Sequence, residues 1–135
     1  MATLAEALYA RSQAVVGITA LVGTRFYPGR APQNLAAGLS YCTWFVVSAE
    51  RPLAGSVSTG LVGCRVQFNS FATTATAAKA LNQAVIAGFH EYAGTSASLV
   101  VQGSMFASPS GIEFYDPTTL LHQVASDFRV WYEGT

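Results

Sequence analysis

Apolar and polar positions follow two different periods along the chain, and the first period is helical. Thr3-Leu-Ala-Glu6 is a capping box, in which the threonine oxygen accepts from a backbone N–H of the first turn and the glutamate reaches back. Apolar residues then recur at helical spacing on one face as far as residue 22. Gly17 interrupts this pattern and indicates a break or a second short helix.

The stretch Leu21-Val-Gly-Thr-Arg-Phe-Tyr-Pro-Gly-Arg-Ala-Pro-Gln33 marks the change from helix to sheet. Gly23 is placed to end the helix, because glycine adopts a positive φ without steric cost. The β-branched and aromatic residues at 24–27 suit a short strand. Pro28 and Pro32 lack a backbone donor, so they predict that the strand stops and that residues 29–39 form a loop.

Two stretches with a period of two follow this loop and predict an antiparallel strand pair. Residues 40–50 are apolar on both faces, which indicates helices on one face and a neighbouring subunit on the other. Residues 51–60, rich in glycine and serine, are typical of a long hairpin connection or a mobile loop. Residues 61–71 alternate cleanly, with Val62, Cys64, Val66 and Phe68 expected to point inward and Arg65, Gln67 and Asn69 outward.

The pattern returns to helical spacing after residue 72. Thr73 or Thr74 can cap a long helix that runs to about residue 92, with one stripe formed by Leu81, Val85, Phe89 and Tyr92, and Gly94 is expected to end it. Two further strands are predicted at 99–107 and 119–133, joined by a loop. The last strand would alternate Val124, Phe128, Val130 and Tyr132 with Gln123, Asp127, Arg129 and Trp131. The whole chain, residues 1–135, is expected to be one α+β domain, with an antiparallel or mixed β-sheet and an N-terminal helix and one long helix packed on one face.

The composition suggests that much of the surface is covered by other protein. Only 10% of the residues are charged and 51% are hydrophobic, with a formal net charge of zero, whereas soluble domains carry about 25% charged residues. A covered surface in an obligate assembly resolves this imbalance. The seven basic residues form no run, which argues against nucleic acid as the main partner. No apolar run approaches the roughly 20 residues that cross a bilayer, and nothing resembles a signal peptide, so we expect synthesis in the cytoplasm and no membrane partner.

Candidate chemistry is sparse, and we expect no enzyme, cofactor or metal site. A nucleophile, base and acid could be written from Ser126, His122 and Asp116, but abundant serine produces such sets by chance and no nucleophile elbow accompanies this one. His90 near a helix end is explained by the helix dipole. Cys42 and Cys64 sit in strand patterns and are expected to be buried free thiols.

Several short segments of the sequence, taken in order, resemble the tail completion, or tail terminator, family of long-tailed bacteriophages and gene transfer agents. The resemblance begins with the early helix and the stretch Leu21–Gln33, and it continues through the strand at 62–71. It then includes Ala77-Ala-Lys-Ala-Leu81, Tyr115-Asp-Pro117 and Asp127-Phe-Arg-Val-Trp-Tyr132. It covers nearly the whole chain, and the family has no catalytic residues to carry over. The chain departs from the family pattern at 36–39 and in the serine-rich loop 56–59.

The resemblance implies a structural virion protein that assembles as a homo-oligomeric ring, commonly of six subunits. Such a ring caps the tail tube, stops its polymerisation and joins the tail to the head connector or stopper protein, so it lies at the head-proximal end of the tail. DNA can pass through it without sequence-specific binding. Because aromatic residues and arginine are enriched at interfaces, the interface candidates are Arg25, Tyr27, Arg30, Trp44, Arg51, Arg129 and Trp131.

We further expect the outer faces of 41–47 and 123–131, or sheet edges, to contribute to subunit contacts, and the loops 51–60 and 107–118 to reach toward the tube or connector. Two alternatives remain open. One is a small ligand-binding α+β module that encloses an apolar pocket between helix and curved sheet. The other is a hydrolase that uses His90 or His122.

Overall fold

Three long antiparallel strands form the middle of the sheet. In the computed structural model, which describes residues 4–29, 39–50, 53–54, 57–58, 61–96, 99–106, 112–117 and 120–133, β5 (Leu61–Ala72) lies between β2 (Tyr41–Glu50) and β9 (Leu121–Glu133). The predicted antiparallel pair is therefore confirmed. β1 (Phe26–Pro28) runs parallel to β2 at the edge of the sheet, so the sheet is mixed.

The other edge of β9 is shared by two strands. β8 (Ile112–Asp116) pairs with residues 121–125 of β9, and β7 (Leu99–Phe106) pairs with residues 128–132. β6 (Tyr92–Ser96) lies outside β7, which gives the order β1-β2-β5-β9-β7-β6. The expectation of a loop between the last two predicted strands was wrong at residues 112–116, because Ile-Glu-Phe-Tyr-Asp forms an added strand there. Within 51–60, the described residues form a small hairpin of β3 (Leu53–Ala54) and β4 (Val57–Ser58).

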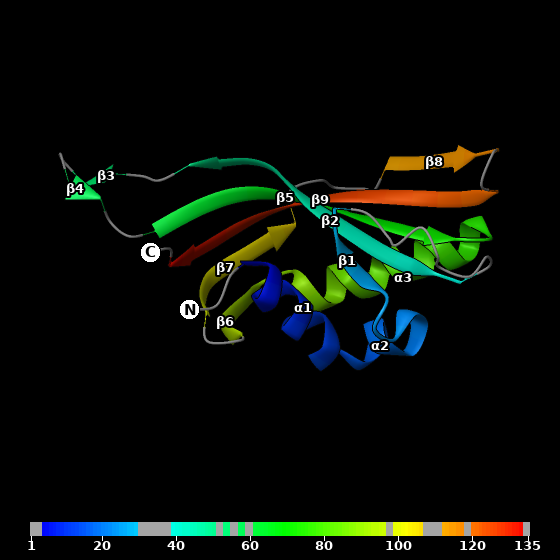
Figure 1. Ribbon diagram of the computed structural model, residues 1–135, viewed down its shortest axis with the longest axis horizontal. Helices are drawn as coiled ribbons and strands as arrows, with labels where there is room; N and C mark the ends of the chain where they lie inside the picture. The colour runs from blue at the N-terminus through cyan, green and yellow to red at the C-terminus, as the bar shows by residue number, and fades with distance from the viewer. Residues whose placement is uncertain are drawn as a thin grey trace.

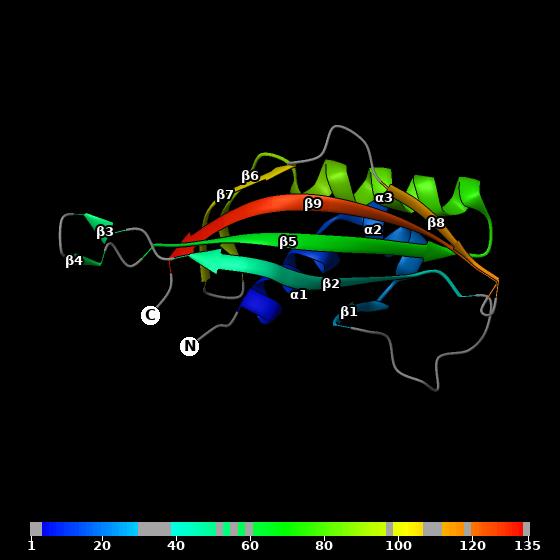
Figure 2. The same cartoon turned by 90° about the horizontal axis from the view of Figure 1, so that it is seen from above.

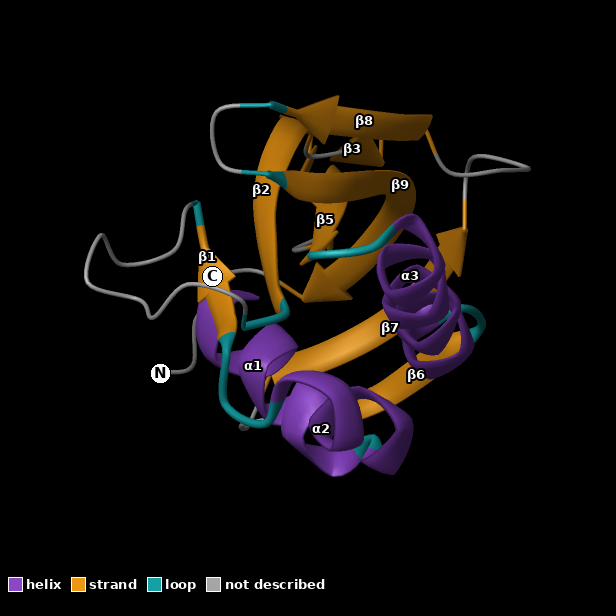
Figure 3. Cartoon of the chain, turned by 90° about the vertical axis from the view of Figure 1, so that its right-hand side faces the viewer, coloured by secondary structure: helices purple, strands orange, loops and turns teal. Residues whose placement is uncertain are grey.

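The helices α1 (Leu4–Ala14), α2 (Val16–Val22) and α3 (Ala75–Phe89) all lie on one side of this sheet (Figures 1 and 3). The expected second short helix is present, and the break falls at Val15, which has an extended backbone. Gly23 ends α2 with φ of +57°. Thr74 caps α3 by accepting from the Ala77 N–H at 3.1 Å. The threonine of the predicted capping box, at position 3, lies outside the described residues.

The long helix ends earlier than its apolar spacing predicts. It stops at Phe89, His90 is extended, and Glu91 has φ of +60°. Tyr92 begins β6, and Gly94 lies inside that strand rather than at a helix end. The apolar spacing continues through Tyr92 because its ring packs against the same core from a strand, with the Arg11 guanidinium 4.1 Å from the ring centroid.

Four phenylalanines from four elements make the centre of the core between helices and sheet. Phe26, Phe68, Phe89 and Phe128 are each at most 2% exposed, and their ring centroids lie 4.8–6.4 Å apart in the recorded pairs. Pairs at this spacing add to the free energy that burial of the rings contributes. The inward residues predicted for β5 are all buried. Asn69 was expected to face solvent. It lies on the outer face but is only 4% exposed, because neighbouring amides cover it.

Candidate functional site

The outer face of the sheet lies opposite the helices. It carries the strand side chains that point away from the core. The register places Tyr41 beside Phe71 and Gln123 at one end, and Arg65 beside Arg129 at the other. Paired residues on adjacent strands point to the same face, and so do residues an even number of positions apart on one strand. All five side chains therefore share the outer face. No helix among the described residues packs on it (Figure 3). The described helices therefore leave the outer face of the sheet open.

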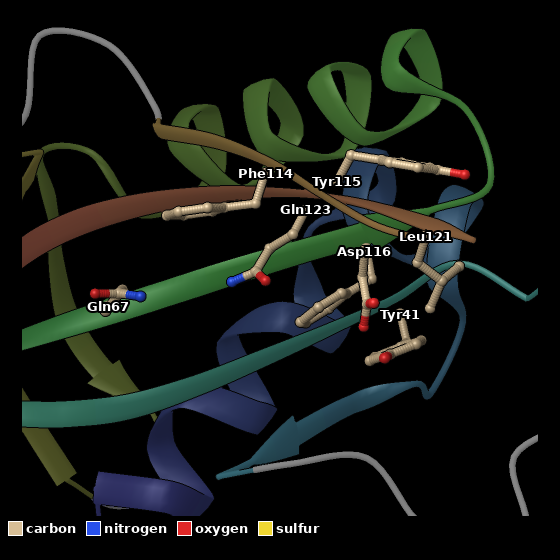
Figure 4. A pocket seen from close by; sticks show the side chains of 8 residues that line it. Tyr41, Gln67, Phe114, Tyr115, Asp116, Leu121 and Gln123 are labelled. Atoms are coloured by element: carbon tan, nitrogen blue, oxygen red, sulfur yellow. The ribbon is translucent and has the colours of Figure 1, made fainter. Parts of the chain in front are cut away.

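A groove of about 360 Å³ lies where β8 joins this face (Figure 4). Its lining residues come from β2, β5, β8 and β9, and they are Tyr41, Gln67, Phe71, Phe114, Tyr115, Asp116, Leu121 and Gln123. The rings of Tyr41 and Phe71 stack with centroids 4.6 Å apart and an interplanar angle of 17°. Burial, followed by the negative charge of Asp116, raises the pKa of Tyr41.

Two glutamines are fixed beside the groove by a buried asparagine. The Nε2 atoms of Gln67 and Gln123 donate to Oδ1 of Asn69 at 2.9 and 2.8 Å. Asn69 thereby has a partner for its carbonyl in a nearly solvent-free position, which a buried polar group requires. The groove consequently has an aromatic wall, orientated amides and one carboxylate.

The opposite end of the outer face is cationic and aromatic. Arg65 forms an ion pair with Asp127 on the neighbouring strand, whereas Arg129 is exposed. The ring of Trp131 lies across Gly63, where an added Cβ would come within 2.2 Å of the indole. This glycine provides the space into which the indole packs on the strand.

β2 exposes three consecutive apolar side chains just beyond the residues that pair with β1. Phe45, Val46 and Val47 are 41%, 42% and 44% exposed. A β-bulge between Val46 and Ser48 shifts the register there. Among the described residues, the partners of β1 on this strand are Cys42 to Trp44. Figures 1 and 2 show that the C-terminal end of β2, together with the start of β5, extends beyond the helices toward the β3–β4 hairpin.

The structure separates the residues that the sequence proposed for an interface. Arg129 and Trp131 lie together on the outer face. Trp44 lies in the core at 6% exposure. Arg25 is engaged within the chain, where its Nε donates to the Ser40 carbonyl at 2.7 Å, and Tyr27 is half-buried in β1. Arg30 and Arg51 lie outside the described residues.

Two aromatic residues of the surface were not found from the sequence. Phe114 and Tyr115 are each 52% exposed on β8, in a stretch that was expected to be a loop. The signal that could have found them is the adjacent aromatic pair itself, because such residues favour strands over loops.

The structure does not bring Ser126, His122 and Asp116 together as a hydrolytic set. The His122 ring lies against Tyr115, with centroids 4.6 Å apart, whereas Asp116 lines the groove on the outer face. Ser126 is buried beside Phe68 in the register, four positions further along β9 from His122. The described residues contain no group of three or more potential metal ligands, and none of their helices is long and apolar enough to cross a membrane. Cys42 and Cys64 are buried free thiols, as expected, and burial raises the pKa of both.

A family model described as "Tail completion protein gp17" matches residues 6–133, which is nearly the whole chain. The chain belongs to this family. Tail completion proteins are structural components of virions, so this one is a structural phage-tail protein and not an enzyme. No curated protein sequence matches it.

The fold of this tail completion protein is also similar to a chain in a solved structure titled "Virion of native gene transfer agent (GTA) particle". The TM-score is 0.72 at 18% sequence identity, over 97% of this chain and 95% of that chain. The match confirms the α+β architecture over almost the full length. At this low identity it is a likeness of fold.

Proposed function

We propose that the protein forms a closed homo-oligomeric ring, of six subunits, at the head-proximal end of a phage or gene-transfer-agent tail. The ring caps the tail tube, stops its polymerisation and docks on the head connector or stopper protein. Family membership and the fold shared with a gene-transfer-agent virion chain support this proposal. A charge content of 10% supports it as well, because a solvated monomer needs more charge on its surface.

The observation that carries the proposal is the exposed apolar run at Phe45, Val46 and Val47. Consecutive exposed apolar side chains on an edge strand are a liability for a free monomer, since such edges pair with other chains. In an assembly, the same run is an interface. A ring requires that one patch meets a different patch on the next subunit, with a rotation that closes.

The axial contacts are proposed for the two ends of the sheet. The β3–β4 hairpin lies beyond the ends of β2 and β5 (Figure 1), where it can reach a tube or connector. The stretch between β7 and β9, which includes β8, is the second axial candidate. Removal of the hairpin tip should leave the ring mass unchanged and abolish capping of the tube. Unchanged capping would exclude the hairpin from the tube contact.

The experiment that tests the function measures tube length. Purified tail tube protein is polymerised with and without this protein, and tube lengths are measured by electron microscopy. The wild-type protein should bind at tube ends and shorten the tubes as its concentration rises. Val46→Asp should lose this activity, because it places a charge in the proposed interface.

Val16→Asp is the matched control for that substitution. Val16 is 79% exposed on α2, on the helical side of the molecule, so the same change should leave capping intact. Tubes of unchanged length with wild-type protein bound along their sides, or not bound at all, would contradict the capping function. Equal activity of the two variants would exclude the β2 run as the interface.

A further inference from the structure

The groove on the outer face has the chemistry of a site for a planar cation. Its polar groups are the glutamine amides, the Tyr41 hydroxyl and the Asp116 carboxylate, and none of its described lining residues is basic. Asp116 lines the groove together with Tyr41, so its negative charge faces the same space as the aromatic rings. The stacked rings of Tyr41 and Phe71 and the exposed ring of Phe114 supply aromatic surface beside these acceptors.

A guanidinium fits such a groove better than an ammonium does. It is planar, so it stacks on aromatic faces, and it offers five N–H donors in a fixed arrangement. A lysine ammonium brings the same charge without the flat surface. The ligand class that the groove selects is therefore an arginine side chain.

The protein itself carries an arginine that lacks a partner within the described residues. Arg11 donates to the Gly88 carbonyl, Arg25 to the Ser40 carbonyl, Arg65 to Asp127, and Lys79 lies 3.2 Å from Glu113. Arg129 is the remaining Lys or Arg side chain of the described residues. It is exposed and makes no hydrogen bond, ion pair or ring contact with the other described residues.

The position of Arg129 increases its need for an acceptor. It lies directly opposite Arg65 in the register of β5 and β9, and like charges opposed across strands destabilise the pair. Asp127 neutralises only one of the two. An acceptor supplied from outside the subunit would neutralise the other.

Arg129 cannot reach the carboxylate of the groove in its own subunit. Gln67 at the near edge of the groove lies opposite Asp127, but Asp116 lies opposite Leu121, and eight strand positions separate Leu121 from Arg129, or about 27 Å at strand rise. Arg129 and Asp116 thus lie at opposite ends of one face. Contact between them requires a second copy of the chain.

We propose that Arg129 of one subunit inserts into the aromatic groove of the next subunit, between the ring of Phe114 and the Tyr41–Phe71 stack, with its charge directed to Asp116. The contact is heterologous, because one patch meets a different patch, and it therefore suits a closed ring. This inference rests on the ring proposed above and names the contact that closes it.

The test uses the full-length protein and four single variants, with native mass spectrometry over a range of concentrations. Arg129→Ala should raise the concentration for half-assembly at least about tenfold, since loss of one partner of a charge pair at an interface weakens it by that order or more. The half-assembly concentration of Arg129→Lys should lie between those of the wild type and Arg129→Ala, because lysine retains the charge without the planar group. Asp116→Asn should match Arg129→Ala. Val16→Ala changes an exposed side chain of α2 on the helical side, away from β8 and β9, and should have no effect.

A mixing experiment separates a lost contact from a damaged fold. Arg129→Ala keeps the groove, and a Phe114→Ser, Asp116→Asn double variant keeps Arg129. At the concentration at which the wild type is half-assembled, each variant alone should be monomeric, with unchanged circular dichroism. Mixed, they retain one intact contact per pair, so they should form heterodimers and no ring. Monomers in the mixture would overturn the proposed contact.

The outcomes also distinguish this inference from the function. If Arg129→Ala forms rings of the wild-type size over the same concentrations as the wild type, the proposed contact is overturned and the ring proposal stands. A wild-type dimer that depends on Arg129 would support the contact and overturn ring closure. A wild-type monomer that ignores tube protein would overturn the proposed function itself.

Discussion

Trp131 lies between two glycines, and alanine at each should have opposite effects on stability. Gly63 on β5 and Gly103 on β7 are both paired with Trp131 in the registers of β9. A Cβ at Gly63 would lie 2.2, 2.5 and 2.6 Å from three atoms of the indole ring. A Cβ at Gly103 would meet nothing within 4 Å, and Gly103 has no positive φ. The pair therefore separates the effect of packing from that of backbone entropy.

The magnitudes follow from these distances. Gly63→Ala requires Trp131 to leave its position over the strand, and overpacking of this kind costs about 1–3 kcal/mol. We expect the lower half of that range, because the indole is only half-buried and can rotate toward solvent. Gly103→Ala at a compatible site should stabilise the protein by about 0.4–1 kcal/mol, since alanine restricts the unfolded chain.

Urea denaturation followed by circular dichroism measures both free energies of unfolding. Tryptophan fluorescence should report the movement as well, since the other indole, that of Trp44, is buried and should not change. Gly63→Ala should shift emission toward that of a solvated indole, and Gly103→Ala should not. The packing argument would be refuted if Gly63→Ala were as stable as the wild type with unchanged emission.

Three further predictions concern the core, a helix cap and the thiols. Phe128→Ala should destabilise the protein by about 3–5 kcal/mol in urea titrations, because the ring is fully buried among other phenylalanines; a loss below about 1 kcal/mol would contradict that core. Thr74→Ala should cost about 1 kcal/mol through loss of the α3 cap, and Thr73→Ala, at the exposed neighbouring position, should cost almost nothing; equal losses would exclude the cap. Burial raises the pKa of the Cys64 thiol to about 11, so its labelling in the folded protein should be slow at pH 8 and rise about tenfold per pH unit toward that value, because only the thiolate reacts. Cys42, also buried, should label no faster, and both should react at ordinary thiol rates in urea; rapid labelling of the folded protein at pH 8 would contradict their burial.

Periodicity predicted the central elements because burial on one face imposes it. The inward side chains of β5 and the cap of α3 are read directly from the chain, and the structure confirms them. The end of α3 was misplaced because Tyr92 contributes to the same core as the helix stripe. Helical spacing does not distinguish a helix residue from a strand residue that packs against the same cluster.

The outer surface was harder to predict, since its residues come together only through strand register. Tyr41, Phe71 and Phe114 are far apart in the sequence. The strand β8 was not predicted because the turn-forming residues around it indicated a loop. Asn69 was placed on the outer face by alternation, yet its burial depends on amides from two strands. Trp44 was proposed for an interface because tryptophan is enriched there, but its position in the alternation of β2 directs its side chain into the core. Composition indicated that a covered surface exists, and only the register shows where the exposed residues gather.

The central claim, that the protein closes a ring on the tail tube, is tested most directly by native mass spectrometry of the wild-type chain with and without tail tube protein. The account predicts one ring-sized oligomer of uniform stoichiometry, either alone or formed from monomers when tube protein is added. A protein that stays monomeric at every concentration with tube protein present would contradict it.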